Sequence, residues 1–158
     1  MNKRDLLARI NAKLAAELEA ITSAALATHA EATDEENKAE DKYDTRGLEA
    51  SYLAHGQSKA AEEAAQAVAQ FSALPVRDFA AGELISLGAL VRLEGRGRSH
   101  YFIGPRAGGT EVDVGGDPVL VITPQSPLGR QLMGRKQGDT LQLDLGGKRS
   151  EFRVSSVA

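Results

Sequence analysis

This chain of 158 residues contains no cysteine and no tryptophan, and only 4% of its residues are aromatic. Without cysteine it can form no disulfide, and it offers no thiolate for metal binding or nucleophilic catalysis. It also has no apolar run of the length that a signal peptide or a membrane span requires. These absences favour a reducing cytoplasm as its location, and the shortage of aromatic residues predicts a thin hydrophobic core.

Familiar catalytic and metal-binding motifs are also missing. The histidines His29, His55 and His100 are far apart in the sequence and show no paired spacing, so a metal or hydrolytic site has little support. The segment Gly129–Lys136 resembles a phosphate-binding loop but lacks its Ser/Thr, and the acidic run from Asp34 fails the EF-hand spacing. A net charge of -3 and a pI near 5.7 argue against independent binding of nucleic acid.

The composition changes sharply near residue 80. Fourteen of the sixteen glycines lie after this point, whereas alanine becomes rare beyond Ala89. We therefore expect a helical domain over residues 1–74, a linker over 75–83 and a second domain over 84–158.

The first domain has two alanine-rich arms of similar length, and apolar residues recur at every third or fourth position in each. This spacing puts them on one face of a helix, so we predict an antiparallel coiled-coil hairpin. The first arm's stripe is Leu7, Ile10, Leu14, Leu18, Ile21 and Ala25, and the second arm's is Leu53, Gly56, Ala60, Ala64, Ala67, Phe71 and Leu74.

Between the two arms lies an acidic segment, at the expected tip of the hairpin. Between His29 and Thr45 it has seven carboxylates and only two lysines, a local charge of about -5. Such runs are often only solvated faces or spacers, but crowding near a tight turn is unfavourable and suggests a cation or a cationic partner. The carboxylates are those of Glu31, Asp34, Glu35, Glu36, Glu40, Asp41 and Asp44.

The second domain is predicted to be α+β, a small antiparallel sheet capped by one short helix. Ser126 and Pro127 supply a helix cap and a first helical residue, and Gly134 ends the helix. Glycine pairs at 108–109, 115–116 and 146–147 mark chain reversals. The expected strands cover Ser86–Glu94, His100–Gly104, Val119–Thr123, Thr140–Leu145 and Glu151–Val157.

Residues 121–136, VITPQSPLGRQLMGRK, followed by Gly138-Asp139-Thr140 and Gly146-Gly147, closely resemble the C-terminal signature of the bacterial Gre transcript cleavage factors (GreA/GreB). The resemblance implies a coiled-coil hairpin joined to a small domain of FK506-binding-protein-like (FKBP-like) fold. It also implies that this domain docks on RNA polymerase while the hairpin enters the secondary channel. The candidate docking residues are Ser126, Pro127, Arg130, Arg135 and Lys136.

In this family, tip carboxylates are thought to help hold a Mg²⁺ ion shared with the polymerase active site, so that the polymerase cuts backtracked RNA. Hard oxygen ligands suit Mg²⁺. This chain departs from the family's Gly-Asp-Leu-Lys-Glu-Asn tip motif, and two registers fit, one with Thr33 and one with Asp44 at the family's aspartate. The candidate catalytic residues are Asp34, Glu35, Glu36, Glu40, Asp41 and Asp44, and the candidate metal ligands among them are Asp34, Glu36, Asp41 and Asp44.

The resemblance therefore implies a transcription elongation factor that stimulates Mg²⁺-dependent cleavage of backtracked RNA, or alternatively a secondary-channel regulator that binds the polymerase without stimulating cleavage. In either case the protein is not itself an enzyme. We expect a monomer that meets the RNA 3′ end only inside the polymerase and contacts no membrane. A peptide-binding or prolyl isomerase role is weaker, because few aromatic residues are available to line a pocket. A plain coiled-coil scaffold would leave the acidic tip unexplained.

Overall fold

The computed structural model describes residues 1–33 and 46–158, and the chain divides into two compact units. The first unit is formed by Met1–Asn11 and Gln70–Ala158, and the second by Ala12–Ala69. The two ends of the helical region thus belong to the same unit as the β-sheet.

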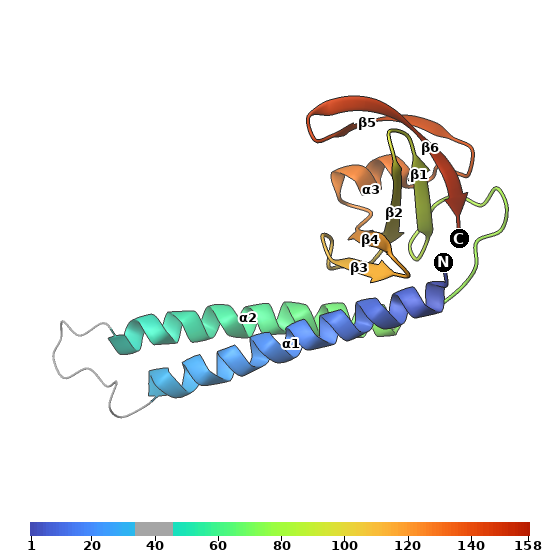
Figure 1. The fold of residues 1–158 in the computed structure, drawn as a ribbon. Helices are drawn as coiled ribbons and strands as arrows, with labels where there is room; N and C mark the ends of the chain where they lie inside the picture. Colours follow the sequence, from blue (N-terminus) through green and yellow to red (C-terminus); the bar gives the residue numbers. More distant parts are fainter. Residues whose placement is uncertain (34–45) are drawn as a thin grey trace. The chain divides into compact units, whose positions relative to one another are not determined.

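Two long helices, α1 (Lys3–Thr33) and α2 (Arg46–Ser72), account for nearly all of the second unit and contribute their ends to the first. They run in opposite directions (Figure 1). Near their ends in the first unit, the Ser72 hydroxyl donates a hydrogen bond to Asn11 Oδ1 (3.3 Å). The predicted antiparallel hairpin is therefore present.

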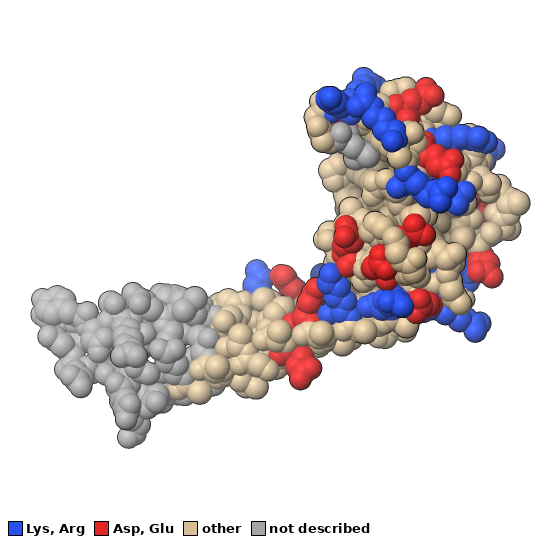
Figure 2. Space-filling model, viewed as in Figure 1, with Lys and Arg blue, Asp and Glu red and all other residues tan. Residues whose placement is uncertain are grey.

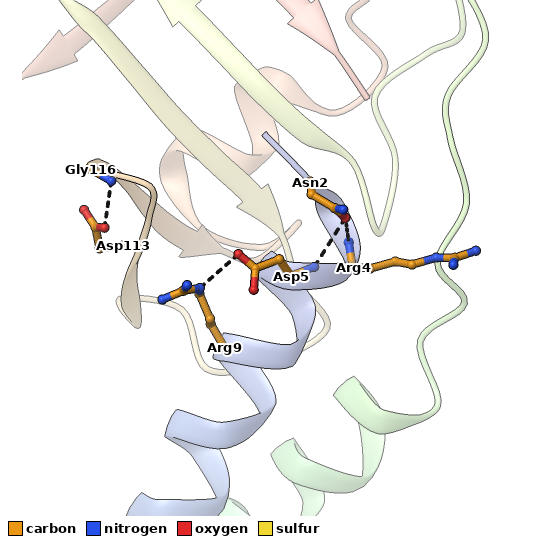
Figure 3. A network of polar contacts seen from close by, with 6 residues as sticks. All are labelled: Asn2, Arg4, Asp5, Arg9, Asp113 and Gly116. Carbon is orange, nitrogen blue, oxygen red and sulfur yellow. Dashed lines mark hydrogen bonds and ion pairs between the residues drawn. The ribbon is translucent and has the colours of Figure 1, made fainter.

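The start of α1 is capped by its own sequence. The side-chain oxygen of Asn2 accepts hydrogen bonds from the backbone N–H groups of Arg4 (2.9 Å) and Asp5 (3.4 Å), which have no partner within the helix. Asp5 also pairs with Arg9 one turn later, at 3.1 Å. Figure 3 shows these contacts, along with a local one in which Asp113 accepts a hydrogen bond from Gly116 N–H (2.9 Å).

Burial confirms the predicted apolar stripe of α1 and the second half of that of α2, at Ala64, Ala67 and Phe71, but not the first half of the α2 stripe. On α1, Leu7, Ile10, Leu14 and Ala25 are buried, whereas Leu18 and Ile21 are half-buried. On α2 the predicted Gly56 and Ala60 are exposed, and a methyl group on Gly56 would meet nothing within 4 Å. An alanine-rich helix offers several apolar stripes, and in the first half of α2 packing selected the positions one residue later, Gln57 and Ala61. The inward-facing residues of α2 are Gln57, Ala61, Ala64, Ala67, Val68 and Phe71.

The first unit contains a six-stranded sheet in the order β3-β4-β2-β1-β6-β5. One short helix, α3 (Pro127–Leu132), follows β4. The strands are β1 (Leu90–Glu94), β2 (Arg98–Ile103), β3 (Glu111–Val114), β4 (Asp117–Ile122), β5 (Thr140–Leu145) and β6 (Lys148–Val157).

The sheet differs from the sequence-based expectation in three ways. It is mixed and not antiparallel, because β4 pairs in parallel with β2, from His100 opposite Val119 to Ile103 opposite Ile122. Strand β3 was not predicted, although the Gly115-Gly116 turn after it was; four residues gave too short an alternation to stand out. Residues 86–89 form a turn that needs the positive φ of Gly88 (+86°), so β1 begins later than expected.

Both faces of this sheet have buried apolar residues, and these are covered within the first unit. One face carries the main core, which includes Val91, Ile103, Leu132 and Val154, all fully buried. On the other face, Phe102 lies against Phe71 at the end of α2, with ring centroids 6.3 Å apart. Gly104 makes room for Phe71, because a Cβ there would lie 2.6 Å from Phe71 Cζ.

The segment predicted as a linker is tied down by specific contacts. The ring of Phe79 lies between the Lys3 ammonium (4.7 Å from its centroid) and the Arg77 guanidinium (3.9 Å). Lys3 Nζ also donates to the carbonyl oxygen of Arg77 at 2.7 Å, and Arg77 pairs with Glu83 at 2.6 Å. Residues 77–83 therefore form a clamp between the first turn of α1 and the sheet.

Among the residues described, neither long helix nor α3 has an apolar stretch sufficient to cross a membrane.

Candidate functional site

The acidic segment lies almost entirely outside the described residues. The six candidate catalytic carboxylates and the four candidate metal ligands among them fall within residues 34–45, so their arrangement stays a prediction. In the part of the chain that the structure does describe, no group of three or more His, Asp or Glu side chains is placed to hold a metal ion.

The candidate docking residues, by contrast, are all described, and they extend from the N-cap of α3 to just after its end. Ser126 has extended backbone angles (φ -65°, ψ 155°), and its hydroxyl oxygen accepts a hydrogen bond from Gly129 N–H at 3.0 Å. The same hydroxyl donates to the carbonyl oxygen of Thr123 at 2.7 Å. Pro127 occupies the first helical turn, where its missing N–H costs nothing. The cap predicted from the sequence is confirmed.

Gly129 is the residue near this cap that no other amino acid can replace. A Cβ at this residue would lie 1.8 Å from the carbonyl oxygen of Thr123 and 2.8 Å from Ser126 Oγ. The first is a backbone atom that cannot swing away. Only glycine allows α3 to lie this close to the end of β4, and this contact fixes the direction of the helix.

Beyond α3 the chain is fastened to the segment before β1. Gly134, with φ +77°, donates to the carbonyl oxygen of Ile85 (3.0 Å), and Ile85 N–H donates back to Arg135 O (2.7 Å). Lys136 N–H donates to the Asp139 carboxylate at 3.0 Å. These bonds hold the backbone of residues 134–136, and the side chains of Arg135 and Lys136 are exposed.

The five candidate residues divide into two kinds. Pro127, Arg130, Arg135 and Lys136 are exposed. Ser126 is half-buried, and its hydroxyl is occupied at both its donor and an acceptor position. The structure thus leaves the proline and the three cations available for contact, and we call these four residues the α3 surface.

Sequence reasoning missed two exposed leucines beside the α3 surface. Leu84 is 54% exposed and Leu87 is 42% exposed, and both flank Ile85, whose backbone pairs with residues 134 and 135. A leucine in a short apolar segment normally predicts core, so the sequence held no signal for this exposure. Basic side chains also gather over the sheet of this unit in Figure 2, toward β5 and β6. The α3 surface, together with Leu84 and Leu87, is therefore basic with an apolar component.

A long antiparallel helical hairpin is combined with a small FKBP-like sheet domain, whose proline-capped helix bears exposed cations. Residues 83–158 match the family model described as transcription elongation factor, GreA/GreB, C-terminal.

Two relatives are similar over most of the chain. The transcription inhibitor protein Gfh1 of Thermus thermophilus is 32% identical over 121 residues, which is 74% of this chain and 73% of that protein. Gfh1 of Thermus aquaticus gives the same identity and coverage. A crystal structure of Gfh1 from Thermus thermophilus covers 94% of each chain at 23% identity, with a TM-score of 0.41.

The chain belongs to the GreA/GreB family of transcription elongation factors. Membership of this family implies RNA polymerase as the partner.

Proposed function

We propose that this protein is a secondary-channel regulator that binds RNA polymerase and restrains transcription without stimulating cleavage of backtracked RNA. The sequence alone favours cleavage stimulation over this function, whereas the similarity to a protein named as a transcription inhibitor favours this one.

The observation that supports this proposal is the similarity to Gfh1, whose name describes a transcription inhibitor. It extends over about three quarters of each chain, so it includes more than the C-terminal domain that the family model matches. The departure of residues 32–37 (ATDEEN) from the Gly-Asp-Leu-Lys-Glu-Asn tip motif points the same way. A cleavage factor needs its carboxylates at fixed positions, because Mg²⁺ demands near-octahedral geometry.

The acidic segment acts, in this proposal, on the Mg²⁺ of the polymerase and not on an ion of its own. Asp34, Glu36, Asp41 and Asp44 offer the hard oxygen ligands that Mg²⁺ prefers. Carboxylates that compete for the metal or for its surroundings would slow nucleotide addition, whereas correctly placed ones would promote hydrolysis.

Docking is the task that we assign to the α3 surface and its neighbouring leucines. Exposed apolar side chains flanked by arginine and lysine fit a partner surface that is apolar at its centre and acidic at its edge. The protein would then act as a regulator of the polymerase in the cytoplasm, not as an enzyme.

Cleavage stimulation is the second candidate function, and the seven carboxylates between His29 and Thr45 favour it. The two candidates share the partner and the site. They differ only in what the acidic segment does once it is in place.

One experiment separates the candidates. Backtracked and active elongation complexes of the cognate polymerase would be supplied with Mg²⁺ and with this protein, and RNA cleavage and elongation rate would be measured together. We expect slower elongation and no added cleavage. Two variants separate the role of the acidic segment from that of the α3 surface. In one, the six candidate catalytic carboxylates are replaced by alanine, and the other carries Arg130→Ala, Arg135→Ala and Lys136→Ala.

The carboxylate variant should bind the polymerase and lose the inhibition, whereas the α3 variant should lose binding. Cleavage that depends on the carboxylates would overturn the proposal in favour of the second candidate. Failure of the intact protein to bind the polymerase would overturn both.

A further inference from the structure

A buried amide oxygen without a partner lies inside the helical hairpin of the second unit. Gln57 of α2 faces inward and is half-buried, and its side-chain oxygen Oε1 is itself buried. Among the residues that the structure describes, it is the one buried side-chain oxygen or nitrogen that makes no hydrogen bond. A buried acceptor that gives up water without gaining a donor destabilises the state that buries it. The packing of α2 in the hairpin is therefore weakened at this residue.

The residues at the same level of α1 offer Gln57 no donor. The Ser72 hydroxyl and Asn11 Oδ1 are hydrogen-bonded across the two helices. Gln57 lies fifteen residues before Ser72, and Leu26 lies fifteen residues after Asn11. Since both helices rise by about 1.5 Å per residue, Gln57 and Leu26 are at about the same level. Here α1 buries the methyl group of Ala25, whereas Leu26 is 66% exposed. The seam thus holds a methyl group and an amide, and the leucine lies outside it.

The residue before Gln57 weakens the same point of α2 from within the helix. Gly56 is exposed, and nothing lies within 4 Å of the position that a Cβ would take, so no close contact requires a glycine. Glycine inside a helix gives up more conformational freedom on folding than any other residue. An unsatisfied amide and a poor helix former thus coincide at two consecutive residues.

We propose that Gly56 and Gln57 form a built-in opening point of the hairpin. The two helices separate at this level, and the Gln57 amide moves from the seam into water, where its oxygen gains the hydrogen bonds that it lacks in the closed state. The hairpin stays closed near Phe71, because the side chains there are large and buried.

An opening point lets the parts of α1 and α2 beyond it change direction while the rest of the hairpin stays packed. Its role would be to fit the hairpin to the walls of the channel that it enters. This role rests on the function proposed above, whereas the opening itself does not, so the two are tested separately.

Hydrogen exchange of the backbone amides in the full chain, followed by NMR, measures the opening. Amides of residues 22–27 and 55–61 should exchange at least about tenfold faster than those of residues 67–71, because they are exposed by the local opening alone.

Variants of α2 test the cause. Gln57→Met keeps the length of the side chain and its helix propensity but removes the unsatisfied oxygen, so it should slow exchange of residues 55–61 about tenfold. Gln57→Glu puts a carboxylate in the seam and should speed this exchange. Gly56→Ala should slow it about threefold through helix propensity. Gln66→Met is the matched control, because Gln66 is exposed on the same helix, and its exchange should be that of the wild type.

Distances between spin labels show whether the helices separate. The chain has no cysteine, so introduced cysteines are the only sites of labelling. Leu26→Cys with Lys59→Cys labels the level of Gln57, and Ala16→Cys with Gln66→Cys labels a level nearer Phe71; all four positions are exposed. We expect a broad distribution with a longer component for the first pair, which Gln57→Met diminishes, and one narrow distance for the second.

The proposal fails if Gln57→Met leaves the exchange of residues 55–61 unchanged. It also fails if Gln66→Met slows this exchange as much, because the buried oxygen would then not be the cause, or if both label pairs give equally narrow distributions. Circular dichroism of each variant shows that the helices are retained. Failure of the intact protein to bind the polymerase would overturn the function proposed above and would leave these results as they are.

Discussion

The base and the arm of the helical hairpin have the same secondary structure but very different interiors. In the base, residues 1–11 and 70–74, Leu6, Leu7, Ile10 and Phe71 are between 0% and 4% exposed. In the arm, residues 12–69, the buried hydrophobic residues among those described are Leu14 and the alanines Ala25 and Ala67. Burying an alanine removes little apolar area from water, so the arm depends on the high helix propensity of alanine instead. The base is stabilised by packing and the arm by local preference.

Of the substitutions that test this contrast, Phe71→Ala is expected to lower the free energy of unfolding the most. Phe71 is 1% exposed and lies against Phe102, so its loss leaves a cavity and should cost about 4 kcal/mol. Hydrogen exchange of the amides in β1, β2 and β4 would measure the cost. The matched change in the arm, Leu18→Ala, should cost only about 1 kcal/mol because Leu18 is half-buried. Equal costs would show that the arm is packed as firmly as the base.

Gly104→Ala should cost about 2 kcal/mol, because the new Cβ would lie 2.6 Å from Phe71 and 2.9 Å from Val121. In the Phe71→Ala background, Gly104→Ala should cost at least about 1 kcal/mol less than in the wild type, and a double-mutant cycle measures this coupling. Gly97→Ala is the control, since nothing lies within 4 Å of a Cβ there. Additive costs would mean that Gly104 does not accommodate Phe71.

The contacts of Lys3 with residues 77–83 predict that the free energy of unfolding depends on pH. Burial lowers the pKa of Lys3 to about 8, with Arg77 also lowering it and Asp78 and Glu83 opposing. The unfolded chain then binds the proton more tightly than the folded one. Keeping Lys3 charged in the folded chain therefore lowers the free energy of unfolding, and this loss is complete below pH 8. The loss disappears as the pH rises toward 10.5, so the free energy of unfolding increases over that range, by at most about 1.4 kcal/mol per pH unit.

Urea unfolding followed by circular dichroism at several pH values between 7 and 10.5 would measure this slope. Lys3→Met keeps the apolar stem and removes the titrating group, so the difference between the variant and the wild type isolates the contribution of Lys3. A difference that does not change with pH would contradict the lowered pKa.

The smallest effect is expected in the arm. Gly56 is exposed within α2 with open space around its Cβ position, so Gly56→Ala should stabilise the helix by somewhat less than about 1 kcal/mol. Gly82→Ala is the counterpart near the base: it also has open space, but φ is +79°, so alanine should destabilise there by about 1 kcal/mol. Helical ellipticity and thermal unfolding would show the opposite signs. A destabilising Gly56→Ala would mean that this glycine has a packing role.

Local features of the molecule were predictable from the sequence. The stripe of α1, the Ser126-Pro127 cap and the glycine turns at 115–116 and 146–147 depend on neighbours within a few residues, and all are present. The resemblance in residues 121–136 gave the family, because that segment combines a cap, a helix stop and turns at fixed separations. The acidic segment was equally visible in the sequence, and the positions of its carboxylates stay a prediction.

What the sequence by itself determined, then, is where helices and turns form, because propensity, capping and glycine conformation act locally. Tertiary structure decided which face of the alanine-rich α2 turns inward, that β4 runs parallel to β2, and that residues 77–83 form a clamp. It also decided that Leu84 and Leu87 stay exposed. Each of these depends on contacts between segments far apart in the chain, for which one-dimensional spacing carries no signal.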